Sequence, residues 1–163
     1  MIGNSPALAE ALGRFEGLYP ETIELSLGRV LNALESLGRP QHRLPPVIHV
    51  AGTNGKGSTC AFMRAMMEAA GLSVHVFTSP HLVRFNERIR LAGEIVDDVR
   101  LIDWLERTYD AIKGQEITQF EATTATALLA FSEVPADVLI LEVGLGGSYD
   151  ATNVIDQPAL SVI

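Results

Sequence analysis

The sequence predicts a three-layer α/β domain, in which a mostly parallel sheet carries helices on both faces. Short valine- and isoleucine-rich runs, suited to strands that are buried on both sides, alternate with longer segments whose apolar residues recur at helical spacing. A glycine-rich loop also joins the first such run to a helical segment, as in phosphate-binding folds. Ligands of these sheets bind at the carboxyl ends of the strands.

Composition limits the classes of function. The chain has 163 residues, 47% of them hydrophobic, which is enough for one domain with its own core. A formal charge of −8, from 20 acidic and 12 basic residues, argues against a nucleic-acid partner. No run approaches a membrane span and no signal-peptide pattern is present, so we expect a soluble cytoplasmic protein without a membrane partner. The single cysteine, Cys60, is expected to be a small buried hydrophobe.

Helical spacing of apolar residues predicts helices at 5–18, 22–37, 58–70, 97–113 and 121–133. Residues 116–120 are expected to form an extended link. Runs of β-branched residues predict strands at 47–51, 73–78 and 159–163, another within 136–144 and a hairpin within 88–96. The strand, helix and strand over 47–78 imply a right-handed crossover and a parallel pair.

A phosphate-binding loop (P-loop) is predicted at the glycine-rich stretch Gly52, Thr53, Asn54, Gly55, Lys56, Gly57, Ser58 and Thr59. Glycines let backbone N–H groups approach an anion, the lysine adds a positive charge, and the following helix adds its dipole. We therefore expect this stretch to bind ATP. Its spacing departs from G-x-x-x-x-G-K-[ST], so a plain glycine-rich turn with an exposed lysine stays open as the alternative.

Glu142 ends a run of four apolar residues, where a charge is costly unless it has a partner. At the carboxyl end of a strand beside a phosphate loop, the natural partner is Mg²⁺. Ser58 in the loop and Ser79 after the strand at 73–78 are expected along the same edge. The sequence thus predicts a magnesium site formed by Ser58, Ser79 and Glu142. An arginine as the partner of Glu142 is the alternative.

Residues 51–59 read Ala-Gly-Thr-Asn-Gly-Lys-Gly-Ser-Thr, which resembles the ATP-binding signature of folylpolyglutamate and dihydrofolate synthases in the Mur-ligase superfamily. Three further parts of the chain match this family in the same order: 79–82 with 84–90, 118–121, and 142–147 with 150–153. Members of the family carry a complete ATPase domain and a second α/β domain. By this resemblance, residues 1–163 form a single, incomplete N-terminal Mur-ligase-type ATPase domain.

The resemblance implies ATP-dependent ligation of L-glutamate to dihydropteroate or (tetrahydro)folate through an acyl phosphate. In that reaction Mg²⁺ and Lys56 stabilise the transferring phosphoryl group. The resemblance also implies a pterin site made of Ile23, Glu24, Leu25, Thr118, Gln119, Phe120, Glu121, Tyr149, Asp150 and Ala151. Packing alone is the alternative for Ile23 and Leu25. The chain departs from the family at Ser148-Tyr149, where arginine-leucine is usual.

Three arginines, Arg84, Arg88 and Arg90, lie within seven positions and could meet anionic substrate groups, with a solvated hairpin face as the alternative. Two other functions stay open at this point. One is a small P-loop phosphotransferase, although no Asn-Lys-x-Asp sequence is present. The other is a noncatalytic nucleotide-binding module. The sequence sets no oligomeric state.

Overall fold

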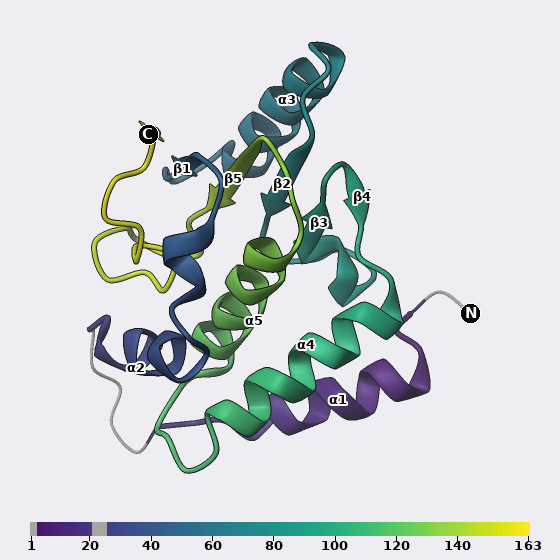
Figure 1. Ribbon diagram of the computed structural model, residues 1–163, viewed down its shortest axis with the longest axis vertical. Helices are drawn as coiled ribbons and strands as arrows, with labels where there is room; N and C mark the ends of the chain where they lie inside the picture. Colours follow the sequence, from purple (N-terminus) through teal and green to yellow (C-terminus); the bar gives the residue numbers. More distant parts are fainter. Residues whose placement is uncertain (1–2, 21–25) are drawn as a thin grey trace.

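A six-stranded sheet forms the centre of the computed structural model, which describes residues 3–20 and 26–163 (Figure 1). Its strand order is β4-β3-β2-β5-β1-β6. Four strands are parallel: β1 (Val47–Val50), β2 (Val74–Phe77), β5 (Val138–Glu142) and β6 (Leu160–Val162). An antiparallel hairpin of β3 (Ile89–Leu91) and β4 (Glu94–Ile95) completes one edge. The predicted α/β class is confirmed.

Helices cover both faces of the sheet, as predicted. Leu139 and Leu141 of β5 belong to the larger core, and Val138 and Ile140 to the smaller one. The smaller core lies under α3 (Lys56–Ala69). The larger core is shared by α1 (Pro6–Glu16), α2 (Gly28–Ser36), α4 (Asp98–Ala111) and α5 (Gln119–Glu133), which gather on the opposite side (Figure 1). Glu142 continues the alternation of Val138 and Ile140 and therefore faces α3.

The predicted pairing of the strands at 47–51 and 73–78 is wrong in one respect. Both strands are parallel members of the sheet, but β5 lies between them. Strand β5 is buried along its whole length, because the neighbouring strands cover its two edges and helices cover its two faces. Its register sets Glu142 opposite Val50 and Leu141 opposite Phe77. The carboxyl ends of β1, β2 and β5 therefore share one edge.

Two helices begin earlier than predicted, and both starts affect the site. Helix α5 begins at Gln119, because Thr118 and Glu121 form a reciprocal capping box. Residues 119–120 are therefore helical and not part of an extended link. Helix α3 begins at Lys56, after Gly55 in a left-handed conformation (φ 79°).

Within the described part of the chain, no helix is long and apolar enough to cross a membrane.

Two short 3₁₀ helices, η1 (Pro40–Arg43) and η2 (Phe85–Arg88), precede β1 and β3. After β3, Ala92 and Gly93 both have positive φ, 48° and 96°, as a two-residue type I′ hairpin turn requires. This turn is anchored by the buried His75 of β2. The Ala92 N–H donates to His75 Nδ1, and His75 Nε2 donates to the Val134 carbonyl, each over 2.9 Å. Both ring nitrogens are thus satisfied in the neutral imidazole.

His75 is expected to make the fold sensitive to acid. Burial lowers the pKa of His75, so the unfolded chain binds its proton more readily than the folded one. Stability is then retained above the unfolded pKa of about 6.5 and lost as the pH falls below it. We expect urea midpoints to fall between pH 7.5 and 5.5, with a shallower fall in His75→Gln. The exposed His42→Gln variant is the control. Equal slopes in His75→Gln and the wild type would contradict this role.

Candidate functional site

The loop between β1 and α3 has the features of an anion site. Its N-cap, Gly55, offers no side-chain hydrogen bond, so the first N–H groups of α3 are left for a ligand. Thr53, Asn54 and Ser58 are exposed. Lys56 is only partly exposed, and its Nζ donates to the Gly52 carbonyl over 2.9 Å. This lysine is therefore folded over the loop and does not extend into solvent as in a plain turn.

The Glu142 carboxylate lies beside this loop and is 4% exposed. Its Oε2 accepts a hydrogen bond of 3.1 Å from the Ser79 backbone N–H. A methyl group at Gly57 would lie 3.7 Å from Oε1. Burial raises the pKa of Glu142, while the Ser79 N–H and the Lys56 charge lower it. Among the described residues, no basic side chain forms an ion pair with Glu142, so the arginine alternative is not observed there.

Of the three residues predicted to hold magnesium, Ser79 and Glu142 are in direct contact at this edge, and Ser58 directly follows Gly57, which lies beside Glu142. Ser79 follows β2, Ser58 lies in the first turn of α3, and Glu142 ends β5. A cavity of about 460 Å³ on the α3 face is lined by Gly57, Ser79 and Glu142, among others. The described residues contain no group of three or more His, Cys, Asp or Glu suited to a metal. A buried carboxylate that has no cationic partner among the described residues suits a hard cation that takes its other oxygens from hydroxyls, a phosphate ligand and water.

Cys60 lies one turn along α3 and is buried. Burial and the nearby Glu142 charge raise the pKa of its thiol to about 12. A thiolate nucleophile is therefore not available near pH 7, and the residue acts as the small hydrophobe that the sequence predicted.

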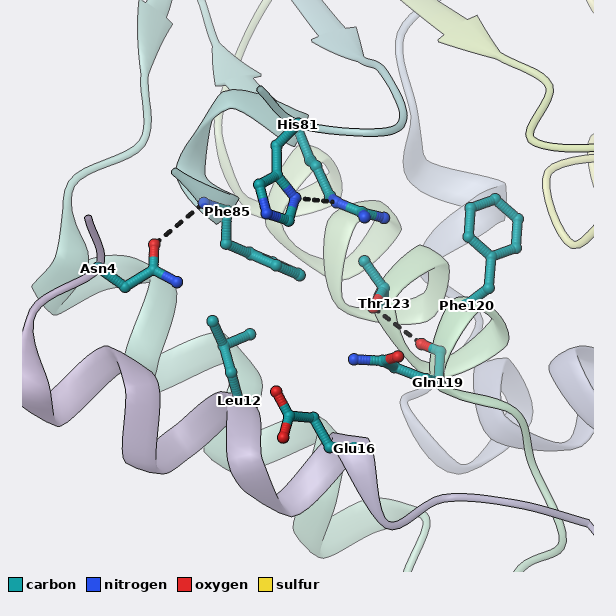
Figure 2. Close-up of a pocket in the computed structure, with 9 residues that line it drawn as sticks. Asn4, Leu12, Glu16, His81, Phe85, Gln119, Phe120 and Thr123 are labelled. Atoms are coloured by element: carbon teal, nitrogen blue, oxygen red, sulfur yellow. Dashed lines mark hydrogen bonds between the residues drawn. The ribbon is translucent and has the colours of Figure 1, made fainter. Parts of the chain in front are cut away.

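On the opposite face of the sheet, a cavity of about 300 Å³ lies between α1, η2 and the start of α5 (Figure 2). In Figure 2, Leu12 and Glu16 of α1 point across it toward His81 and Phe85. The lining residues come from three separate parts of the chain: Asn4, Leu12, Glu16, His81, Phe85, Arg88, Gln119, Phe120 and Thr123. Aromatic surface and polar groups are thus combined, as in small-molecule sites.

A second cavity, of about 390 Å³, shares Arg88 and Phe120 with the first. It reaches Ser79, Gly144 and Leu145, so it connects the aromatic cavity with the edge that carries the predicted metal residues. Because Arg88 and Phe120 line both, the two cavities are neighbouring parts of one surface.

Arg88 is the positive group of this surface. Its Nε donates to His81 Nδ1 over 2.9 Å, and its guanidinium lies 5.2 Å from the Phe85 ring centre. No carboxylate among the described residues forms an ion pair with it, and burial lowers its pKa. The other two arginines of the cluster have protein partners, Arg84 the Asp98 carboxylate and Arg90 the Gly93 carbonyl. Arg88 is thus the one suited to an anionic ligand.

The Phe120 ring packs directly on a glycine. A methyl group at Gly144 would lie 2.4 Å from Phe120 Cζ and 3.1 Å from Asp150 Oδ2, so only glycine allows this approach. The Asp150 carboxylate is buried and accepts hydrogen bonds from the backbone N–H groups of Leu145 and Thr152. Phe120 and Asp150, widely separated in sequence, therefore meet at Gly144.

The remaining residues predicted for the pterin site are placed less uniformly. Gln119 lines the aromatic cavity, whereas Thr118 caps α5, and Glu121 forms a buried fork with Arg29 of α2. Tyr149 is 62% exposed and Ala151 is part of the larger core. Ile23, Glu24 and Leu25 lie outside the described residues.

Sequence reasoning missed the contribution of α1, because Leu12 and Glu16 read as ordinary positions of an amphipathic helix. It also missed a hydrogen-bonded chain that runs from His49 of β1 through Thr152 to Asp150. Only the Asp-x-Thr spacing at 150–152, a local turn signal, pointed toward this chain.

Gly144→Ala is expected to separate the effect of this close approach from the chemistry of the site. The added methyl group has to displace the Phe120 ring, which we expect to lower the free energy of unfolding by about 1–3 kcal/mol. Chemical denaturation of Gly144→Ala and Gly147→Ala measures this, since a methyl group at Gly147 meets nothing within 4 Å. A Gly144→Ala variant as stable as Gly147→Ala would show that the ring yields without cost.

No family model matches the chain. The chain is 43% identical over 153 residues to a dihydrofolate synthase/folylpolyglutamate synthase of Escherichia coli, covering 91% of this chain and 35% of that protein. A relative with the same name from Bacillus subtilis is 42% identical over 164 residues, covering 96% and 38%. The chain thus spans about a third of the length of these relatives.

Solved structures agree with these sequence matches. E. coli FolC in complex with DHPP and ADP has a TM-score of 0.84 and 41% identity, over 94% of this chain and 37% of that one. A Yersinia pestis folylpolyglutamate synthase/dihydrofolate synthase with AMPPNP and a Mn ion has a TM-score of 0.87 and 39% identity, over 97% and 39%. Along almost its whole length the chain is thus similar in sequence and in fold to folylpolyglutamate synthases and dihydrofolate synthases, of which it spans about a third.

Proposed function

We propose that this chain is the ATP-binding part of a cytoplasmic ligase that joins L-glutamate to dihydropteroate, to a folate or to both. The observation that carries the proposal is the shared sheet edge. The loop 52–59, the Glu142 carboxylate and a cavity lined by Arg88, which has no carboxylate partner among the described residues, all lie at this edge. The relatives bound to DHPP and ADP, and to AMPPNP and a Mn ion, support an acceptor and a metal nucleotide as the ligands. The chain spans about a third of its relatives, so we propose that residues 1–163 alone do not complete the reaction.

The nucleotide is assigned to the loop 52–59. Its N–H groups and the dipole of α3 would hold the phosphates of ATP, and Lys56 would exchange its bond to the Gly52 carbonyl for one to phosphate. Ser58, Ser79 and Glu142 would hold Mg²⁺, because they combine two hydroxyls with a carboxylate that lacks a cationic partner. Bound there, the ion would neutralise charge on the phosphate oxygens of ATP.

The acceptor is assigned to the two connected cavities. Phe120 would offer its ring face to the acceptor's aromatic system, with Gln119 beside it. Arg88 is the group that would receive the acceptor carboxylate, which must lie between the aromatic cavity and the phosphate loop. The further pterin-site residues are proposed from the family resemblance: Ile23, Glu24, Leu25, Thr118, Glu121, Tyr149, Asp150 and Ala151.

The proposed reaction is the one that the family resemblance implies. An acceptor carboxylate oxygen attacks the γ-phosphorus of ATP, and ADP leaves, which forms an acyl phosphate. The amine of L-glutamate then attacks the acyl carbon, phosphate leaves, and the nitrogen loses a proton to give the amide. Lys56 in the loop and Arg88 in the cavity would stabilise negative charge on the transferring phosphoryl group.

The activity is tested with the full-length gene product. We expect ADP release to require both dihydropteroate and L-glutamate, with the amide product detected by mass spectrometry. Lys56→Ala is expected to weaken ATP binding by about tenfold or more, because a charge-assisted contact is lost while the fold is kept. Lys113→Ala, at the chain's exposed other lysine, is the matched control. ADP release that ignores the acceptor, or unchanged ATP affinity in Lys56→Ala, would contradict the proposal.

The metal assignment is tested with Glu142→Gln, which keeps the shape and the acceptor for the Ser79 N–H but removes the charge. We expect calorimetry to show Mg·ATP binding weakened by about tenfold or more and metal-free ATP binding changed much less. Glu116→Gln, on an exposed carboxylate, controls for net charge. An equal loss of affinity for the two forms of ATP would remove Glu142 from the metal site.

A further inference from the structure

Three side chains form a continuous hydrogen-bonded chain between β1 and the loop after β5. His49 Nε2 lies 2.8 Å from Thr152 Oγ1, and Thr152 Oγ1 lies 2.5 Å from Asp150 Oδ1. Thr152 is fully buried and Asp150 nearly so. The backbone of His49 is paired on both sides, with Leu141 of β5 and Ser161 of β6. The chain therefore starts from a fixed point of the sheet, three residues before the phosphate loop.

The direction of the chain follows from counting protons. A threonine hydroxyl has one proton to donate, and a carboxylate is a stronger acceptor than an imidazole nitrogen. Thr152 therefore donates to Asp150, and Thr152 Oγ1 must accept from His49. His49 thus carries a proton on Nε2. Burial lowers the pKa of His49 while the Asp150 charge opposes that shift, which agrees with a neutral ring in this tautomer near pH 7.

The far end of the chain reaches the acceptor cavity. Oδ1 of Asp150 also accepts from the Thr152 N–H, and Oδ2 accepts from the Leu145 N–H over 2.8 Å. The same Oδ2 lies beside Gly144, on which the Phe120 ring packs. Gly144 and Leu145 form one wall of the cavity that Ser79 and Arg88 also line. The orientation of Asp150 thus fixes the backbone of this wall.

A purely structural role would not need a histidine at this position. β1 is flanked by strands on both sides, and its other residues, Val47, Ile48 and Val50, are the apolar kind that such a strand favours. His49 instead presents a donor to Thr152, and this donor leaves the hydroxyl proton free for Asp150. The contact therefore links the strand that leads to the phosphate loop with the wall of the cavity for the acceptor.

We propose that His49 is a positioning residue: its Nε2–H holds Thr152 and Asp150 in the orientation that shapes the Gly144–Leu145 wall, and so sets the affinity for the acceptor. This inference rests on the proposed function, since it assigns that cavity to the acceptor. It predicts an effect on one substrate and not on the other. The affinity for ATP should depend on the loop 52–59, whereas the hydrogen bond of the His49 side chain goes to Thr152.

The tautomer is tested first, on the 163-residue chain. ¹⁵N NMR of the histidine rings at pH 7 should show His49 neutral with its proton on Nε2, and that proton should exchange with water slowly. In Thr152→Val, which keeps the shape but removes the hydroxyl, the same proton should exchange faster. A proton on Nδ1 in the wild type would overturn the assigned direction.

The functional effect is measured on the full-length gene product. His49→Leu and Thr152→Val should raise the KM for dihydropteroate by about tenfold, the scale of one lost hydrogen bond, with ATP affinity changed less than twofold. His49→Gln and Thr152→Ser keep a donor and a hydroxyl, and should recover most of the wild-type KM. His42→Gln, on an exposed histidine, should match the wild type.

Each result separates the hypotheses. Equal losses for ATP and dihydropteroate, or a lower melting temperature with unchanged KM, would leave His49 a structural residue only and overturn the proposal. An unchanged KM in both Thr152→Val and His49→Leu would do the same. A wild-type protein that consumes ATP without needing dihydropteroate would instead overturn the proposed function, and the positioning role with it, whatever tautomer the NMR spectra show.

Discussion

The buried carboxylate of Glu142 is the constraint on which the rest of the site depends. It sits at the end of a strand buried along its whole length, where a charge is stable only with compensating groups. The described protein supplies one N–H donor, from Ser79, and the charge of Lys56 near it, but no ion pair. A buried carboxylate with so little compensation favours the binding of a cation. The groups around it then determine which other ligands that cation would have.

Strand order produces this arrangement. Because β5 lies between β1 and β2, its last residue has the phosphate loop on one side and Ser79 on the other. If β1 and β2 were direct neighbours, Glu142 would lie at the margin of the pair and could not be flanked by both loops. The alternation along β5 also sends Glu142 toward α3 and Leu141 toward the helical core.

Local features of the fold could be predicted because their causes are local. Ser5 and Asp97 cap α1 and α4 where the sequence indicated, and the glycine loop precedes its helix. The start of α5 was recognisable in principle, since Thr118-x-x-Glu121 is a capping-box pattern. The residues proposed for magnesium could also be grouped from sequence, since the carboxyl ends of parallel strands share an edge whatever the strand order is.

The parts that escaped prediction depend on contacts between distant segments. The sequences of β1 and β2 do not indicate that β5, which begins about 60 residues after the end of β2, lies between them. The aromatic cavity needs α1 to lie across η2 and α5, which a periodic pattern cannot specify. Glu121 is a second example of a residue whose role depends on a contact with a distant segment. Its carboxylate reads as a ligand for a pterin ring by resemblance, yet in the fold it is shared between the Thr118 N–H and Arg29.

A protein with a net charge of −8 can attract an anion only through local positive groups. The loop 52–59 contributes N–H groups and Lys56, and the acceptor cavity contributes Arg88. At physiological salt, charges on the far surface are screened beyond about 8 Å, whereas partly buried groups are screened much less. These local positive groups, more than the overall charge of the protein, are therefore what an anionic ligand would meet at this edge.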